Sequence, residues 1–275
     1  MNGIMKLGLI VSLNRDPMES FEKVARLGIP TCQVSAVAEV MLESFDPIHV
    51  RKCADRAGVE ISSFFLLFEG QIFNNKDGPA TMGFIPPPYR ERRLALAKEF
   101  SNMVRDMGVN SITSHVGFIP DDEEDPLYRS FLPVMREFVE HCARNGQIFC
   151  FETGQELPST LKRTILDLGM DNLGINLDPA NLILYGKANP IDAVEIFGEY
   201  VRGMHAKDGL WPNRDESLGI EVPLGEGMVN FPLLLRRLKE KGFRGPVTIE
   251  REISGSRQIE DIKRAIRILK PLLYY

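Results

Sequence analysis

The sequence predicts an α/β protein that folds as a single (β/α)8 barrel. The chain has 275 residues, close to the ~250 that are typical of this barrel and long for most other folds with one core. Short apolar runs alternate with helical patterns along the whole chain, which indicates a parallel sheet. No GxGxxG follows the first apolar run, so an open doubly wound sheet is less favoured than a closed barrel.

The first half of the chain shows this alternation most clearly. Strands are expected at residues 6–12, 31–35, 60–67 and 111–117. Helices are expected at residues 21–28, 47–58 and 89–108, each of which ends at a glycine, the residue that favours a helix C-terminus. Residues 68–88 are rich in glycine and proline and predict a long loop after the third strand. Loops of this length in compact domains are usually functional.

The second half continues the pattern without a change of composition. An acidic turn at 121–126 is expected to be the solvated start of a helix that ends near Gly146. The remaining strands are expected at 147–153, 172–178, 201–208 and 245–250, and the remaining helices at 158–169, 190–200, 231–242 and 258–272. A second long loop spans 209–229. One barrel domain is therefore expected over residues 1–275, with both long loops at the C-terminal face.

Composition excludes several classes of partner. The chain is 44% hydrophobic and 26% charged, as expected of a globular protein with a large core. Its net charge of −5 and its lack of basic runs disfavour nucleic acid and anionic membranes. The N-terminal apolar run is too short to span a bilayer and lacks a signal-peptide layout, so a cytoplasmic location is expected.

The four cysteines form no CxxC pair. Most of them lie inside strand or helix patterns, so they are expected to be reduced and mostly buried thiols. A role for one of them as a metal ligand is left open, although free cysteines are far more often simply buried.

Polar residues end four consecutive predicted strands. These are Glu152, Asp178, His205 and Glu250. On the last three strands they share a face with small or polar residues, while the opposite face is apolar. The division is less clear at 147–153, where both faces are apolar. All four side chains are expected to point into the mouth of the barrel.

Three carboxylates that converge without a cation would repel each other strongly in a site of low dielectric constant. A divalent metal ion removes this repulsion. Three carboxylates with one imidazole favour Mn²⁺, Mg²⁺ or Co²⁺, and Zn²⁺ is compatible. Taken singly, each acid could instead cap a helix and the histidine could be a hydrogen-bonded core residue, but four such residues at adjacent strand ends favour a metal site.

Several segments resemble one known family. ETGQE, NLDPANLILYG, HAKDG, PLGEG and TIEREISG are similar to motifs of the sugar (phosphate) isomerase/epimerase family, which has the xylose-isomerase-like TIM barrel, and the resemblance covers essentially the whole chain. In ketose 3-epimerases of this group, the matching Glu, Asp, His and Glu bind one divalent metal ion. The resemblance implies that Glu152, Asp178, His205 and Glu250 are the ligands of one such ion, foremost Mn²⁺, and that Glu152 and Glu250 are also the catalytic acid/base pair.

The resemblance has two departures. Those epimerases place a substrate-binding His three residues after the metal Asp and an Arg six residues after the metal His. This chain has Asn181 and Trp211 at these positions. The family and the metal site are unaffected, but the substrate is expected to differ.

The implied reaction is proton transfer next to a carbonyl, through an enediolate stabilised by the metal. The expected substrate is a small sugar, a sugar phosphate or a keto-polyol. Isomerisation and epimerisation both fit. An inosose-type dehydratase that uses the same metal site is the alternative, followed by a non-catalytic sugar-binding barrel. A homodimer or a homotetramer is compatible with the sequence.

Five further residues are expected to bind substrate, each with a structural alternative. His115 shares the inward face of its strand but could be structural. Lys207 could neutralise an oxyanion or a phosphate, or form a salt bridge at the rim. Glu156 could bind a hydroxyl or cap a helix. Asn181 and Trp211 occupy the two positions at which the chain departs from the epimerases.

Overall fold

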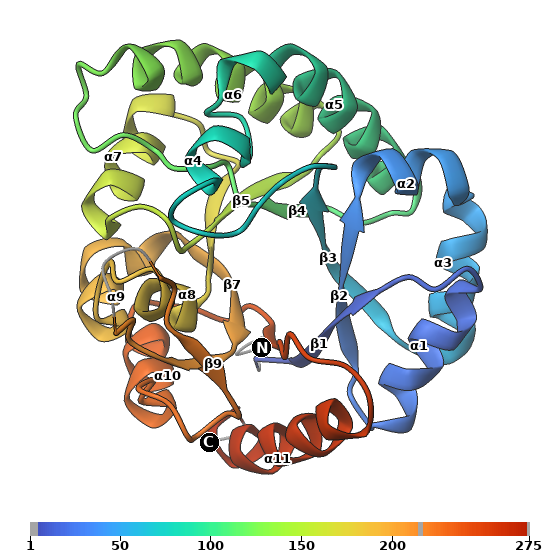
Figure 1. Cartoon of the computed structure of the whole chain (residues 1–275). Coiled ribbons are helices and arrows are strands. Elements are labelled where there is room, and N and C mark those ends of the chain that lie inside the picture. The colour runs from blue at the N-terminus through green and yellow to red at the C-terminus, as the bar shows by residue number, and fades with distance from the viewer. Residues whose placement is uncertain (1–4, 214–216, 274–275) are drawn as a thin grey trace.

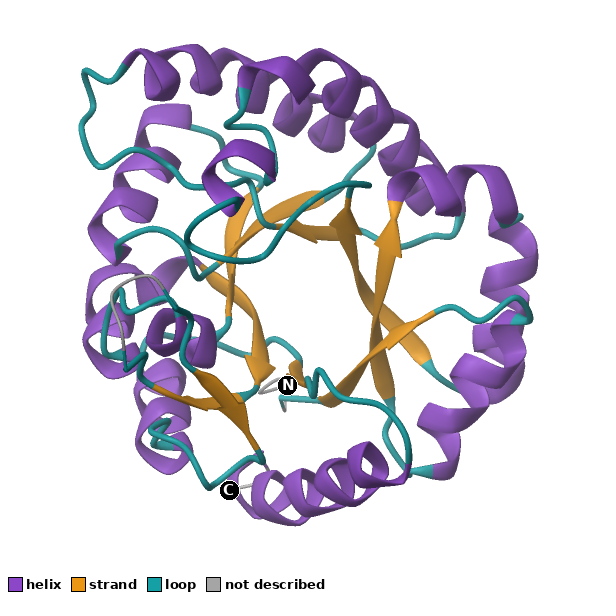
Figure 2. Cartoon of the chain, viewed as in Figure 1, coloured by secondary structure: helices purple, strands orange, loops and turns teal. Residues whose placement is uncertain are grey.

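The computed structural model describes residues 5–213 and 217–273. Eight parallel strands close into a barrel in the order β1-β10-β7-β6-β5-β4-β3-β2, within these residues. Helices form a ring outside the barrel, as Figure 1 and Figure 2 show. The predicted single (β/α)8 barrel is therefore confirmed.

The barrel strands are short and alternate with the outer helices. The strands are β1 Leu7–Ser12, β2 Thr31–Val37, β3 Glu60–Leu67, β4 Ser111–Ser114, β5 Ile148–Glu152, β6 Leu173–Leu177, β7 Val201–Ala206 and β10 Val247–Ile249. The helices are α1 Pro17–Arg26, α2 Ala38–Ser44, α3 Pro47–Ala57, α4 Gly78–Thr81, α5 Arg90–Asp106, α6 Pro126–Arg144, α7 Pro158–Leu168, α8 Pro179–Leu184, α9 Pro190–Phe197, α10 Phe231–Glu240 and α11 Ser256–Leu273, with 3-10 turns at Pro87–Tyr89 and Gly198–Tyr200.

Many of the outer helices begin in the same way, with a capping side chain followed by proline. Proline suits the first helical position because it fixes φ and needs no hydrogen bond there, and the side chain before it accepts a hydrogen bond from a backbone N–H. This pattern starts helices at Asp16, Asp46, Asp125, Asp178 and Asn189. The acid at the end of β6 is therefore also a helix cap.

Apolar side chains fill the layer between the barrel and its helices. On β6, Leu173, Ile175 and Leu177 are at most 3% exposed. Inside the barrel there is less space than between the barrel and its helices. Glycine is required where the side chain of a neighbouring strand lies too close to leave room for a Cβ. A Cβ at Gly203 would lie 2.5 Å from Asn176 Oδ1. The small residue on β7 thus leaves room for the polar side chain on β6.

The two predicted long loops contain structure of their own. The segment 68–88 includes α4 and is held against the end of β4, where the N–H groups of Phe84 and Ile85 donate to Val116 O at 2.7 and 3.2 Å. The segment 209–229 includes part of an antiparallel hairpin, β8 Asp208–Leu210 and β9 Ile220–Val222, while its residues 214–216 lie outside the described part. The two segments follow the carboxyl ends of β3 and β7.

The searched residues, 5–213 and 217–273, include no helix with the length and apolar character needed to cross a membrane.

Candidate metal centre and active site

Four neighbouring strands bring the predicted ligands together. Glu152 ends β5, Asp178 follows β6, His205 lies on β7 and Glu250 follows β10. One ligand atom from each lies within 4.8 Å of the others. Glu152, Asp178 and His205 are buried, and the Glu250 side chain is 14% exposed. The barrel mouth therefore forms the expected three-carboxylate, one-imidazole cluster.

Two of the carboxylates each use one oxygen to bond the protein. Glu152 Oε2 accepts from Asn176 Nδ2 at 2.5 Å. Asp178 Oδ1 caps α8 by accepting from the Asn181 N–H at 2.9 Å. The other oxygens, Glu152 Oε1 and Asp178 Oδ2, are buried without a hydrogen-bond partner. Each carboxylate is thus held by one oxygen and offers the other to the centre.

His205 likewise bonds the protein through one ring nitrogen and directs the other toward the centre. His205 Nε2 lies 2.5 Å from Gln33 Oε1, an acceptor, so Nε2 carries the hydrogen of the neutral ring. In that neutral form, which binding of a metal ion requires, Nδ1 presents its lone pair to the centre. It lies 2.9 Å from both Glu152 Oε1 and Glu250 Oε2, but it has no partner in hydrogen-bond geometry.

These atoms fit a divalent cation. Buried polar atoms are nearly always paired, and an unpaired one is costly. Here three unpaired buried atoms, on Glu152, Asp178 and His205, belong to one cluster. A cation bound between them would satisfy all three, and the bonds from Asn176 and Gln33 are of the kind that orient metal ligands in proteins.

Charge separates the pKa values of the two glutamates. Burial raises the pKa of Glu152 to about 7, despite the nearby His205. Burial also opposes ionisation of Glu250, but Lys207 and His205 outweigh it and lower the pKa of Glu250. Burial likewise disfavours the charged imidazole of His205, yet Glu152 and Glu250 raise its pKa well above the ordinary value. Without a metal ion, the cluster therefore holds protons to reduce its negative charge.

Lys207 supplies a built-in positive charge beside the cluster. Its Nζ is buried and lies 3.6 Å from Asp178 Oδ2 and 3.7 Å from Glu250 Oε2. It also forms an ion pair with Glu252 and donates to Asn181 Oδ1 at 3.2 Å. Burial disfavours the charged ammonium, but Glu250 and Asp178 raise the pKa of Lys207 well above its usual value. Lys207 is therefore held charged at the edge of the site.

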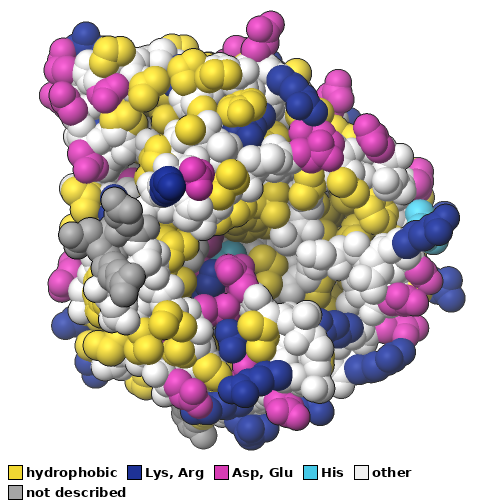
Figure 3. Space-filling model, viewed as in Figure 1, with side chains coloured by type: hydrophobic (Ala, Val, Ile, Leu, Met, Phe, Trp, Pro, Cys, Tyr) yellow, Lys and Arg dark blue, Asp and Glu magenta, His cyan; other side chains and the backbone are white. Residues whose placement is uncertain are grey.

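A cavity of about 310 Å³ opens above the cluster and reaches Glu152 and Glu250. Figure 3 shows this hollow at the barrel mouth, with charged and histidine side chains beside apolar ones. Its apolar lining includes Phe65, Phe73, Leu184 and Tyr185, and its polar lining includes His115, Asn181, Lys207 and Glu252. An apolar cavity with a few convergent polar groups is typical of a small-molecule site.

His115 faces this cavity as a neutral ring. Burial and the nearby charge of Lys207 lower the pKa of His115 to about 3. Its ring lies edge-on to Phe65 and Phe73, with centroids 5.5 and 5.6 Å away. Its Nδ1 is buried without a partner. It can therefore donate or accept one hydrogen bond to a molecule in the cavity.

The five predicted substrate-binding residues differ in position. His115, Asn181 and Lys207 line the cavity, whereas Glu156 and Trp211 do not. Glu156 is buried, and burial raises its pKa to about 8. Trp211 is 38% exposed. The roles of all five stay predictions.

The residues that hold the ligands, Gln33 and Asn176, were not predicted from the sequence. Gln33 and Asn176 each place a polar side chain inside an otherwise buried strand. A polar residue on the inward face of a barrel strand was a signal for both. Phe65 and Phe73, in contrast, carried no such signal, because one is an aromatic residue in an apolar strand and the other lies in a loop.

The family model described as the xylose isomerase-like TIM barrel matches residues 21–272. The chain belongs to this family. A crystal structure of a xylose isomerase domain protein from Planctomyces limnophilus is 36% identical, with a TM-score of 0.91, and the match covers 98% of this chain and 97% of that one. An uncharacterized protein of Methanocaldococcus jannaschii is 32% identical over 117 residues, which is 42% of this chain and only 36% of that relative.

More distant structures share the fold of this xylose isomerase-like barrel. A D-psicose 3-epimerase from Clostridium cellulolyticum H10 with D-tagatose is 15% identical, with a TM-score of 0.72 and coverage of 98% of this chain and 99% of that one. A xylose isomerase-like TIM barrel protein from Mycobacterium smegmatis in complex with magnesium is 19% identical, with a TM-score of 0.68 and coverage of 93% and 89%.

Proposed function

We propose that this protein is a divalent-metal-dependent epimerase or isomerase of a small sugar or keto-polyol. The observation that carries the proposal is the set of three buried, unpaired ligand atoms on Glu152, Asp178 and His205, which meet Glu250 at the floor of a cavity. Solved structures that share the fold include several sugar 3-epimerases. These observations support a cation site formed by the four residues and acid/base roles for Glu152 and Glu250.

Glu152, Asp178, His205 and Glu250 would hold the cation, for which Mn²⁺ and Mg²⁺ suit the oxygen-rich donor set. A magnesium complex is known for one structure with this fold. When bound, the ion would polarise a substrate carbonyl and stabilise negative charge that develops on its oxygen. Lys207 adds a second positive charge at the same edge.

Glu152 and Glu250 are proposed to move the proton. A pair of carboxyl groups with separated pKa values is suited to opposite roles, one as acid and one as base. Glu250, whose pKa is lowered by Lys207 and His205 despite burial, fits a base that starts ionised. In the metal-free protein, burial raises the pKa of Glu152 to about 7. A bound cation would lower this pKa, so Glu152 is proposed to take up and return the proton during the reaction.

The lining of the cavity is consistent with a sugar. Phe65, Phe73 and Tyr185 offer apolar surface to the face of a ring or an extended carbon chain, while His115 and Asn181 offer hydrogen bonds to hydroxyl groups. Asn181 stands where the epimerases that the chain resembles carry histidine. The substrate hydroxyl that Asn181 contacts is therefore proposed to be bound differently from the hydroxyl that histidine contacts in those epimerases.

Solvent-deuterium incorporation tests the proposal directly. The metal-loaded protein would be incubated in D₂O with a panel of ketoses and inososes, and each product would be followed by NMR and mass spectrometry. Deuterium at the carbon next to the carbonyl, together with a mixture of epimers or isomers, is the expected result. Formation of an enone or a diketone would replace this assignment with dehydration, and lack of exchange with every compound would count against proton transfer.

A further inference from the structure

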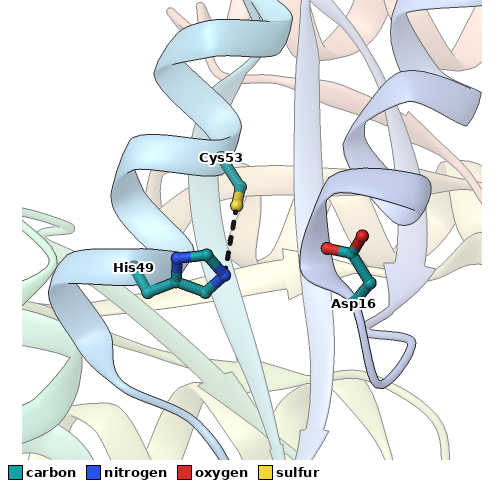
Figure 4. Close-up of side chains that lie close together, drawn as sticks. All are labelled: Asp16, His49 and Cys53. Atoms are coloured by element: carbon teal, nitrogen blue, oxygen red, sulfur yellow. Dashed lines mark hydrogen bonds between the residues drawn. The ribbon is translucent and has the colours of Figure 1, made fainter.

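A second cluster of potential metal ligands lies outside the barrel mouth. Asp16, His49 and Cys53 converge between α1 and α3, as Figure 4 shows. Asp16 precedes α1, while His49 and Cys53 lie one helical turn apart on α3 and so share one face of it. The ligand atoms of the three residues lie within 4.8 Å of one another. None of them belongs to the proposed active site.

The spacing of the two α3 donors matches that of zinc ligands. His49 Nε2 and Cys53 Sγ are 3.7 Å apart. In a tetrahedral zinc site, with Zn–S of about 2.3 Å and Zn–N of about 2.0–2.1 Å, ligand sulfur and nitrogen atoms are about 3.6 Å apart. A cation could therefore enter between these two atoms with little movement of α3.

The third potential ligand, Asp16, has one carboxylate oxygen that is not used by its helix cap. Asp16 Oδ1 caps α1 by accepting from the Met18 N–H at 3.0 Å, so Oδ2 remains for a cation. Asp16 and His49 are exposed, whereas Cys53 is buried. One carboxylate oxygen of Asp16 already lies within 4.8 Å of the His49 and Cys53 ligand atoms, and water can complete the coordination from the solvent side.

Binding of a cation would require the Cys53 thiol to lose its proton. Burial and the Asp16 carboxylate raise the pKa of the Cys53 thiol, although Arg56 opposes them. The thiol is therefore protonated without a metal ion, and the unfavourable charge of Asp16 next to a thiolate becomes favourable when a divalent cation lies between them.

We propose that Asp16, His49 and Cys53 form a second site for a divalent cation of the zinc class. The combination of thiolate, imidazole and carboxylate selects a borderline-soft ion such as Zn²⁺ or Co²⁺ over Mg²⁺ and Mn²⁺. Bound there, the ion ties the start of α1 to the first turns of α3, two helices that pack against each other. The role is structural, because no cavity of the proposed active site includes these residues.

Cobalt spectroscopy tests this site independently of any activity. Co²⁺ bound by a thiolate gives a sulfur-to-cobalt charge-transfer band, and the cluster at the barrel mouth contains no sulfur ligand. The full-length protein, freshly reduced, would be titrated with Co²⁺ alone. The expected result is a charge-transfer band whose intensity corresponds to one Co²⁺ ion per chain at this site. The band should disappear when Zn²⁺ is added.

Matched variants locate the band. Cys53→Ser should abolish it, and His49→Gln should weaken binding at least tenfold. Asp16→Asn should weaken binding while asparagine keeps the helix cap. Cys142 is a buried thiol on α6. The variants Cys142→Ser and Glu250→Gln should leave the band unchanged. Lack of a band in the wild-type protein, or a band that persists in Cys53→Ser, would overturn the proposal. Neither result would bear on the active site.

Discussion

At the scale of single residues, each ligand of the candidate metal centre has two polar side-chain atoms. One bonds the protein and the other faces the centre. Glu152 and Asp178 each bond the protein through one oxygen, and His205 does so through Nε2. The opposite atom of each is left unpaired at the centre. This division fixes the orientation of each ligand before any ion binds.

The proposed acid/base roles predict the effect of removing either glutamate. Glu250→Gln and Glu152→Gln should each reduce deuterium exchange into the substrate by about 10² or more, the usual contribution of a general acid or base. Glu252→Gln, which changes an acid that pairs with Lys207, is the matched control and should retain far more exchange. Equal loss in all three variants would mean that charge alone, and not proton transfer, is affected.

The bond from Gln33 predicts a positioning role. Gln33→Leu removes the acceptor of His205 Nε2 and should weaken Mn²⁺ binding by about 10- to 100-fold, the usual cost of losing such a partner. Mn²⁺ titration followed by electron paramagnetic resonance measures this. Thr113→Val removes the weaker contact of Gln33 Nε2, at 3.5 Å, together with a contact to Ser63 Oγ at 3.3 Å, but keeps the acceptor of His205. This variant should bind Mn²⁺ nearly as well as the wild type. Unchanged affinity in Gln33→Leu would refute the role.

Buried Glu156 predicts a dependence of stability on pH. Burial raises its pKa from 4.5 to about 8, so the folded protein holds this proton more tightly than the unfolded chain does. The contribution to stability is full below pH 4.5 and is lost as the pH rises through 8. At pH 9, Glu156→Gln should therefore raise the free energy of unfolding by a few kcal/mol, with little effect near pH 4. Urea unfolding at both pH values measures the difference, and an equal effect at both would contradict it.

At the scale of elements, the segment 68–88 is a structured cover whose position depends on one glycine. Gly83 has φ +60°, and a Cβ there would lie 2.0 Å from the carbonyl carbon of Val116. Arg93 Nη1 donates to Gly83 O at 2.7 Å from α5. Backbone contact on one side and an arginine on the other hold the segment to the end of β4.

This contact predicts a large difference between two glycine variants. Gly83→Ala should lower the free energy of unfolding by at least about 2 kcal/mol more than Gly146→Ala does. Gly146 also has positive φ, at +69°, but its added Cβ would meet nothing within 4 Å. Comparison of their urea midpoints separates backbone strain from the steric clash. Similar losses of unfolding free energy in the two variants would show that the segment 68–88 moves to accommodate the added Cβ at little cost.

The elements also show what a single sequence can predict. The inward parity of Asp178, His205 and Glu250 was readable because their strands have one clearly apolar face. The short helices α2 and α8 were not predicted, because seven and six residues are too few to display a helical period. The hairpin of β8 and β9 was also missed, since three-residue strands leave no alternation to read.

At the scale of the whole molecule, closure of the barrel is what assembles the site. β10 pairs with β1 and with β7, so Glu250, near the end of the chain, comes next to His205. The alternation of strands and helices predicted this closure. The partners Gln33 and Asn176 could not be identified as such, because their contacts depend on register across the barrel.

The central claim is that four strand ends form one site for one divalent ion. The direct test is the number of Mn²⁺ ions bound per chain at equilibrium, measured in the Cys53→Ser background so that the second proposed site is absent. One ion per chain is expected, and Asp178→Asn, which retains an oxygen to cap α8, should lose most of the affinity. No bound Mn²⁺ in the parent protein, or undiminished binding in Asp178→Asn, would contradict the claim.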